Sequence, residues 1–167
     1  MECLVFAVGL VDAMRAHART AYPEECCGFL LAPSDGGSAT DARSIVDVVP
    51  APNRSNGERE RRFVILPEML RVAEEAAARR GALVAGFYHS HPDHPARPSQ
   101  FDQEHAWPWY AYVILSSSKG DRSPAIGAFE LDPERREFRS IGIGAESPRA
   151  ALGGDPRAAG TTGVREP

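Results

Sequence analysis

The sequence has few cysteines. Its 167 residues contain three, of which Cys3 stands alone while Cys26 and Cys27 are adjacent. An odd count without a Cys-x-x-Cys spacing argues against a structural zinc knuckle, and a disulfide framework would need more cysteines in a chain of this size. We predict that Cys27 is a small buried hydrophobic residue at the start of a strand, with Cys26 facing the other side.

Long apolar runs are also missing. No run reaches the roughly 18 residues needed to span a bilayer, and the first residues show no basic segment followed by an apolar one. We therefore expect neither a membrane span nor an export signal. Together with the low cysteine count, these absences favour the cytoplasm.

An excess of positive charge is absent as well. The formal net charge is -4 at pH 7 and the pI is about 5.7, so nucleic acid is not expected as a partner. A local cluster of arginines is interrupted by Glu58 and Glu60 and is best interpreted as a solvated loop. The alternative is that it docks an acidic face of a partner. The cluster consists of Arg54, Arg59, Arg61 and Arg62.

The composition, 43% hydrophobic and 25% charged, is ordinary for one soluble globular domain. Apolar periodicity predicts helices over residues 10–21 and 67–80. We expect an α/β fold, a mixed sheet flanked by helices, whose strand order the pattern does not give. The predicted strands cover residues 3–7, 27–31, 45–49, 83–88, 110–116, 125–131 and 137–143, with an extended piece at 63–66.

The C-terminal segment differs from the rest. Residues 146–167 contain few large apolar side chains and several Gly, Pro and Ala. They are expected to be a disordered tail, so the predicted folded domain covers residues 1–145.

Two imidazoles, a hydroxyl and a carboxylate gather between residues 89 and 102. His89 and His91 follow an apolar strand at alternate positions, so they point to the same face. A catalytic zinc ion usually takes three protein ligands and leaves its fourth position to water. Asp102, one turn into a helix that starts at Ser99, is the candidate third ligand.

Simpler interpretations exist for the same residues. Histidine pairs at i and i+2 occur on ordinary strands, and Ser99 with Asp102 is also a helix cap. The combined spacing favours a metal over these readings. A hydrolytic zinc site also needs a carboxylate base that is not a ligand. Glu24 and Glu25, directly before an apolar strand, are both candidates, and composition does not separate them.

These motifs resemble those of the JAMM (MPN+) metalloprotease family. The family pattern, His-x-His, seven residues, Ser, two residues, Asp, runs without a gap from His89 to Asp102. A second motif, Pro-x-Glu-x-Cys-Gly, places its glutamate at Glu25. The resemblance covers about residues 1–143. It implies that His89, His91 and Asp102 bind one zinc ion, that Glu25 is the general acid/base, and that Ser99 helps to stabilise the oxyanion.

The resemblance also implies a fold and a reaction. The fold is a curved, largely antiparallel sheet packed between helices, with a layout like that of cytidine deaminases. The reaction is hydrolysis of an amide bond without a covalent intermediate. Glu25 would accept a proton from a water whose pKa the zinc lowers toward about 7, and would then pass it to the leaving amine.

The short form of the motifs resembles the CysO-cysteine peptidase branch of the family. The expected partner is therefore a small ubiquitin-like sulfur-carrier protein ending in Gly-Gly, from which cysteine is a candidate product. A small-molecule zinc hydrolase is disfavoured because the deaminase ligand pair Pro-Cys-x-x-Cys is absent. A non-catalytic scaffold is disfavoured because no site residue is missing. The sequence leaves a homodimer open.

Polar and aromatic residues outside these motifs allow two interpretations. Trp107, Trp109, Tyr110 and Tyr112 follow the predicted Asp102 helix, and core packing is favoured over lining of a substrate groove. Asn53 lies in a polar loop, where a role in a turn and a contact with an extended peptide are both open.

Overall fold

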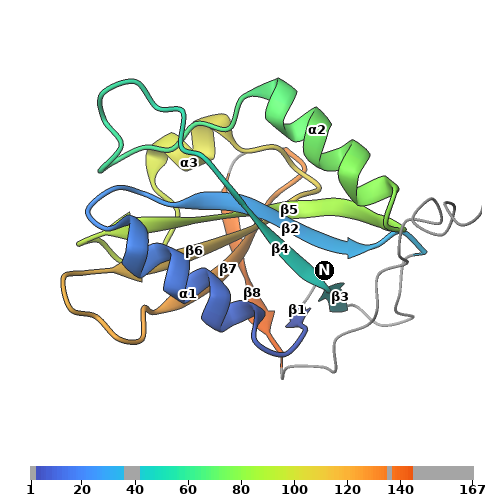
Figure 1. Ribbon diagram of the computed structural model, residues 1–167, viewed down its shortest axis with the longest axis horizontal. Coiled ribbons are helices and arrows are strands. Elements are labelled where there is room, and N and C mark those ends of the chain that lie inside the picture. The colour runs from blue at the N-terminus through green and yellow to red at the C-terminus, as the bar shows by residue number, and fades with distance from the viewer. Residues whose placement is uncertain (1–2, 36–41, 135–136, 145–167) are drawn as a thin grey trace, which may run out of the picture.

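The computed structural model describes residues 3–35, 42–134 and 137–144 (Figure 1). The predicted tail at 146–167 and the domain end at 145 lie outside these residues. The longest described helices have 12 residues each, and none is long and apolar enough to cross a membrane. The described elements are β1 (Cys3–Phe6), α1 (Leu10–Ala21), β2 (Cys27–Pro33), β3 (Ala42–Ile45), β4 (Asp47–Ala51), α2 (Pro67–Ala78), β5 (Ala82–Pro92), α3 (Gln100–His105), β6 (Ala111–Ser117), β7 (Ile126–Leu131) and β8 (Phe138–Ile143).

The strands form one mixed sheet in the order β3-β1-β8-β7-β6-β5-β2-β4. The pairs β2–β4, β2–β5, β6–β7 and β7–β8 are antiparallel, whereas β1–β3, β1–β8 and β5–β6 are parallel. The α/β class and the mixed sheet are thus confirmed, with antiparallel pairs in a small majority.

One extended segment joins the two ends of this sheet. The predicted single strand over residues 45–49 is wrong: β3 pairs with β1, and β4 pairs with β2. Between them, the backbone N–H of Val46 donates a hydrogen bond to the carbonyl of Leu31 at 2.8 Å. Since β3 and β4 stand at opposite ends of the strand order, this segment brings the sheet close to a closed barrel.

The helices cover opposite faces of the sheet, α1 on one side and α2 with α3 on the other (Figure 1). Met14 and Ala18 of α1 pack in one apolar cluster with Tyr88, whereas Phe87 packs in a second cluster with Ala77 of α2. Strand residues alternate between the two clusters, as the two-residue period of a strand requires.

The cysteines follow the same alternation. Cys26 belongs to the cluster beneath α1 and Cys27 to the cluster beneath α2, and both are buried. Burial raises the pKa of the Cys26 thiol to about 11 and that of Cys27 to about 12. The structure therefore supports the prediction of two inert, buried cysteines on opposite faces.

Strand β5 runs through the middle of the sheet and carries the predicted histidines. It lies between β2 and β6 and continues through Pro92, four residues beyond the predicted end at residue 88. Its parallel neighbour is so close that a Cβ at Gly86 would meet the backbone of Ala111. Glycine at this position allows the tight pairing that buries the strand.

Candidate metal centre and active site

Strand β5 places two imidazoles on the face that α2 and α3 cover. His89 pairs with Cys27 of β2 and with Ile114 of β6, and its side chain is 1% exposed. The side chain of His91, two residues on, is 10% exposed. Their Nε2 atoms lie 3.0 Å apart. The alternation predicted from the sequence thus brings both rings to one point.

Helix α3 brings a buried carboxylate to the same point. Asp102 Oδ1 lies 3.2 Å from His89 Nε2, and its Oδ2 lies 3.4 Å from His91 Nε2. Ser99 caps the helix: its Oγ accepts a hydrogen bond from the Asp102 backbone N–H at 3.1 Å, and its own N–H and hydroxyl lie 2.7 and 2.6 Å from Asp102 Oδ2. Asp102 therefore takes part in the helix cap and lies beside both histidines at the same time.

The three side chains have the spacing of metal ligands. Ligand atoms around a tetrahedral zinc ion, each about 2.0–2.2 Å from it, are separated by roughly 3.3–3.6 Å. The separations here are close to that range: 3.0 Å between the two Nε2 atoms, 3.2 Å from His89 Nε2 to Asp102 Oδ1, and 3.4 Å from His91 Nε2 to Asp102 Oδ2. His91 Nδ1 lies 3.2 Å from the carbonyl oxygen of Pro95, an acceptor that keeps the proton on Nδ1 and leaves Nε2 for a metal. The residues therefore fit a small divalent cation.

The electrostatics of the cluster also suit a cation. Burial lowers the pKa of His89. Burial alone would raise the pKa of Asp102, but hydrogen bonds from both histidines and Ser99 hold it well below its usual range. Burial opposes a charge on His91 as well, yet Asp102 raises the pKa of His91 overall. A proton on His91 thus balances the Asp102 carboxylate, and a metal ion would take the place of that proton.

Glu25 borders this cluster, and Glu24 does not. Glu25 is 5% exposed, and burial raises its pKa to about 8, with His91 acting against this rise and Asp102 adding to it. The carboxylate of Glu24 is half-exposed and lies 3.8 Å from the guanidinium of Arg59. The structure therefore separates the two glutamates, which composition does not: Glu25 is buried beside the cluster, and Glu24 is half-exposed.

The backbone around Glu25 is held from two sides. On the sheet side, Ser90 Oγ accepts a hydrogen bond from the Cys26 N–H at 2.9 Å, and the Ser90 N–H donates to the Cys26 carbonyl at 3.0 Å. On the loop side, the Glu25 N–H donates to the carbonyl of Arg59 at 2.7 Å. No role for Ser90 is predicted from the sequence. Its position between two histidines, on the opposite face of the strand, is nevertheless a signal that it could support the site from behind.

Asn53 completes this support. Its amide nitrogen donates to the carbonyls of Glu25 and Arg62 at 3.2 and 2.9 Å, and its amide oxygen accepts from the N–H groups of Ser55 and Val64 at 2.9 and 3.2 Å. Both ends of the amide are used within the chain. The structure thus favours the turn interpretation over contact with a bound peptide.

Comparison of the sequence with known proteins identifies the family of this chain. A sequence profile of Prok-JAB, prokaryotic homologs of the JAB domain, matches residues 7–127. The chain belongs to the Prok-JAB family. It is 34% identical over 118 residues to the desampylase of Haloferax volcanii (68% of this chain, 80% of the relative). It is 35% identical over 144 residues to the CysO-cysteine peptidase of Mycobacterium tuberculosis (84% and 82%).

A solved structure that is similar to this chain supports the fold. The solution structure of a protein from Salinibacter ruber shares 38% identity with this chain and has a TM-score of 0.65, covering 90% of this chain and 97% of its own. The family resemblance drawn from the two motifs is confirmed.

Two hollows border the cluster of His89, His91 and Asp102 in this Prok-JAB protein. One, of about 240 Å³, is lined mainly by apolar side chains that include Phe63, Phe101 and Trp107, and Asp102 forms part of its wall. The other, the polar hollow, has a volume of about 490 Å³, and six of its eight lining residues have polar or charged side chains, among them Glu25, His91 and Ser99. The residues that border the cluster therefore differ between its two sides.

The aromatic residues after α3 are divided between core and surface. Tyr112 is buried, and its hydroxyl binds the backbone of Trp107 at 2.6 and 3.0 Å, as core packing predicts. Trp107 is 43% exposed and lines the apolar hollow. The expectation of core packing is wrong for Trp109, which is 82% exposed.

Replacement of Asn53 by alanine tests the support of Glu25. We expect Asn53→Ala to lower the free energy of unfolding by about 1–3 kcal/mol, because several backbone groups lose their partner, and to lower turnover because Glu25 loses its brace. Urea unfolding and single-substrate kinetics measure the two effects. Asn56→Ala, at an exposed position in the same loop, is the matched control and should change neither; equal effects of both variants would contradict the bracing role.

Proposed function

We propose that this chain is a cytoplasmic, zinc-dependent peptidase that hydrolyses the amide bond after the C-terminal Gly-Gly of a small ubiquitin-like or sulfur-carrier protein. The observation that carries the proposal is a buried carboxylate, Glu25, beside the cluster of His89, His91 and Asp102 without being one of its members. The names of the relatives, a CysO-cysteine peptidase and a desampylase, support a peptidase of this family that acts on small ubiquitin-like proteins.

Zinc is the metal that the donor set favours. Two imidazole nitrogens and one carboxylate oxygen are common ligands of a catalytic zinc ion. When bound by His89, His91 and Asp102, zinc supplies Lewis-acid chemistry, since it polarises an amide carbonyl and lowers the pKa of a water molecule. Because Ser99 orients Asp102 and Pro95 orients His91, the ligands are held in place from outside.

Glu25 moves the proton. A raised pKa makes the Glu25 carboxylate a stronger base toward the attacking water, and the leaving amine, which is more basic still, can then take the proton from it. The oxygen of water forms a bond to the carbonyl carbon, the bond from that carbon to the leaving nitrogen breaks, and Glu25 delivers the proton to that nitrogen. The products are a carboxylic acid and an amine, which become a carboxylate and an ammonium group when the second proton of the water passes to the amine. No covalent enzyme intermediate is needed.

Ser99 lies where it can serve the same reaction. It lines the polar hollow together with Glu25 and His91. In the resting arrangement its hydroxyl donates a hydrogen bond to Asp102 Oδ2, and the two oxygens lie 2.6 Å apart. Turning that hydrogen toward the developing oxyanion would add a donor during the reaction, while the backbone N–H of Ser99 keeps its own bond to Asp102.

The apolar hollow suits the tail of the substrate. It is lined by residues 63–65, which belong to neither a helix nor a strand, and by Asp102. A Gly-Gly tail has no side chains, so it can lie along an extended segment and thread a narrow passage that excludes bulkier chains. The carrier protein itself would remain outside, and its last carbonyl would reach the metal centre.

Metal content and cleavage test the proposal directly. We expect about one zinc per chain by elemental analysis of protein purified without added metal, and cleavage of a sulfur-carrier protein extended by one residue after Gly-Gly. A chelator should abolish cleavage and zinc should restore it. Zinc without cleavage of any Gly-Gly conjugate, whether peptide or lysine-linked, would contradict the proposed substrate, and absence of zinc after reconstitution would contradict the metal.

The two adjacent glutamates provide a matched pair of variants. Glu25→Gln should keep zinc but lower turnover by about 10²–10⁴-fold, the usual contribution of a general acid/base. Glu24→Gln, which removes an exposed charge, should retain both. His89→Ala and Asp102→Ala should lose zinc and activity together. Turnover by Glu25→Gln at the rate of Glu24→Gln would show that the base lies elsewhere.

Ser99→Ala separates catalysis from capping. At saturating zinc, turnover should fall by about 10²–10³-fold through loss of an oxyanion donor. Zinc affinity should fall by about 10–100-fold, because Asp102 loses one of the groups that orient it. Ser99→Thr keeps the hydroxyl and should restore most of both. A Ser99→Ala protein that is less stable but turns over normally at saturating zinc would leave Ser99 with the cap alone.

A further inference from the structure

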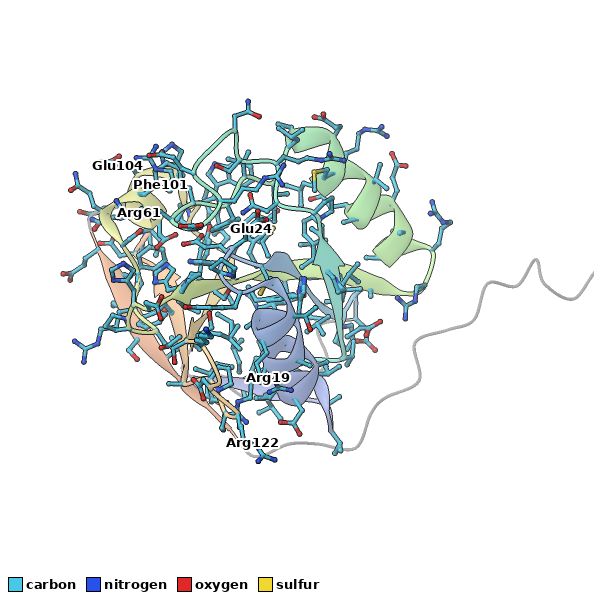
Figure 2. All side chains as sticks on the ribbon, turned by 60° about the vertical axis from the view of Figure 1, so that its left-hand side comes forward. Arg19, Glu24, Arg61, Phe101, Glu104 and Arg122 are labelled. Atoms are coloured by element: carbon cyan, nitrogen blue, oxygen red, sulfur yellow. The ribbon has the colours of Figure 1, made fainter. Side chains whose placement is uncertain are left out.

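The polar hollow has a rim of basic residues, two of them arginines, that the mechanism above does not use. Arg61 reaches it from the loop between β4 and α2, while His94 and Arg97 reach it from the loop between β5 and α3. Figure 2 shows Arg61 on the same side of the molecule as Phe101 of α3, away from Arg19 and Arg122. Two segments far apart in the sequence thus bring cations to one opening.

The two guanidinium groups of this rim are available for a ligand. Within the described part of the chain, neither Arg61 nor Arg97 forms an ion pair, in contrast to two other arginines of the same cluster. Arg59 pairs with Glu24 and Arg62 with Glu58. The sequence pattern favours a solvated loop for the whole cluster, with docking of an acidic face of a partner as the alternative. The structure instead sets Arg61 apart, because it lines the hollow.

The direction of proton transfer tells which part of the substrate enters this hollow. The inference rests on the proposed function: Glu25 gives its proton to the leaving nitrogen, so that nitrogen lies beside Glu25. Glu25 is in the wall of the polar hollow and not of the apolar one. The group attached to the leaving nitrogen therefore faces Arg61 and Arg97.

We propose that Arg61 and Arg97 bind the α-carboxylate of the leaving group, so that the preferred substrate ends in Gly-Gly followed by a single amino acid with a free carboxyl group. An α-carboxylate is two bonds from the nitrogen that Glu25 protonates, which keeps it close to the site. The planar fork of a guanidinium matches the two oxygens of a carboxylate. A lysine side chain in a modified protein would bring no such carboxylate to the rim.

The test measures binding instead of turnover. Zinc-loaded Glu25→Gln protein is titrated with a labelled peptide ending in Gly-Gly-Ala, once with a free C-terminal carboxylate and once as the amide. Alanine avoids the direct binding of a cysteine thiol to the metal. We expect the carboxylate peptide to bind about tenfold more tightly, as for one or two solvent-accessible charge-assisted hydrogen bonds.

Variants then locate the preference. In the same background, Arg61→Gln and Arg97→Gln should each weaken binding of the carboxylate peptide by several-fold, the double variant by about tenfold, and none should change binding of the amide. Arg79→Gln, at an exposed position at the end of α2, is the charge control and should alter neither. Equal affinity for the two peptides would overturn the inference.

The outcomes also distinguish this inference from the proposed function. Equal loss of both peptides in the arginine variants would mean that the rim contacts another part of the substrate, and the inference would fall. Wild-type enzyme that cleaves carboxylate and amide conjugates at the same rate would keep the peptidase and remove the subsite. Carboxylate-dependent binding without cleavage would support the subsite and contradict the peptidase.

Discussion

The pairing of β5 with β2 is the contact on which the rest of the site depends. It sets Cys27 opposite His89, and the two hydrogen bonds between Ser90 and Cys26 extend the contact to the residue next to Glu25. Because side chains alternate along a strand, a slip of one residue would turn Glu25 away from the imidazoles. The close approach at Gly86 holds the other edge of β5 against β6.

The third member of the cluster depends on the other two. Helix α3 has only six residues, and a helix of that length is not stable on its own. It is held by its cap and by Asp102, whose carboxylate lies within 3.4 Å of both imidazoles. The same carboxylate thus closes the helix and completes the cluster. The two interpretations of Ser99 and Asp102 that compete at the level of sequence are therefore two aspects of one arrangement.

The sequence predicted the parts of the structure that depend on local pattern. The alternation of His89 and His91, the start of α3 and most strands follow from periodicity and capping. The split of residues 42–51 into β3 and β4 did not, because it arises when the two ends of the sheet approach each other, which is a non-local event. The core position predicted for Trp109 is wrong. Aromatic residues usually favour the core, but Trp109 has a positive φ of 78° and an exposed side chain.

Side chains with the same chemistry could not be told apart before their neighbours were known. Glu24 and Glu25 differ only in direction, and the direction comes from β5 and from the Arg59 carbonyl. Asn53 has the composition of a turn residue, but its position between the Glu25 segment and the following loop appears only in three dimensions. Such assignments require contacts between segments distant in sequence.

The buried polar groups of the cluster lower the stability of the fold, which indicates that they serve binding. His89 Nδ1 is buried without a hydrogen-bond partner among the described residues, and Glu25 is a buried acid whose pKa of about 8 reflects the cost of its charge. Apolar side chains of similar size would fold more stably there. Polar groups kept at such a cost mark a functional site.

The shape around the cluster then limits what is bound. A hydrolase of a small molecule needs one pocket that surrounds its substrate. Here an apolar hollow and a polar hollow whose rim carries two arginines border the same cluster of His89, His91 and Asp102. That arrangement suits a substrate with a flexible tail without charged side chains on one side of the scissile bond and a small charged group on the other. A Gly-Gly tail linked to an amino acid has this form.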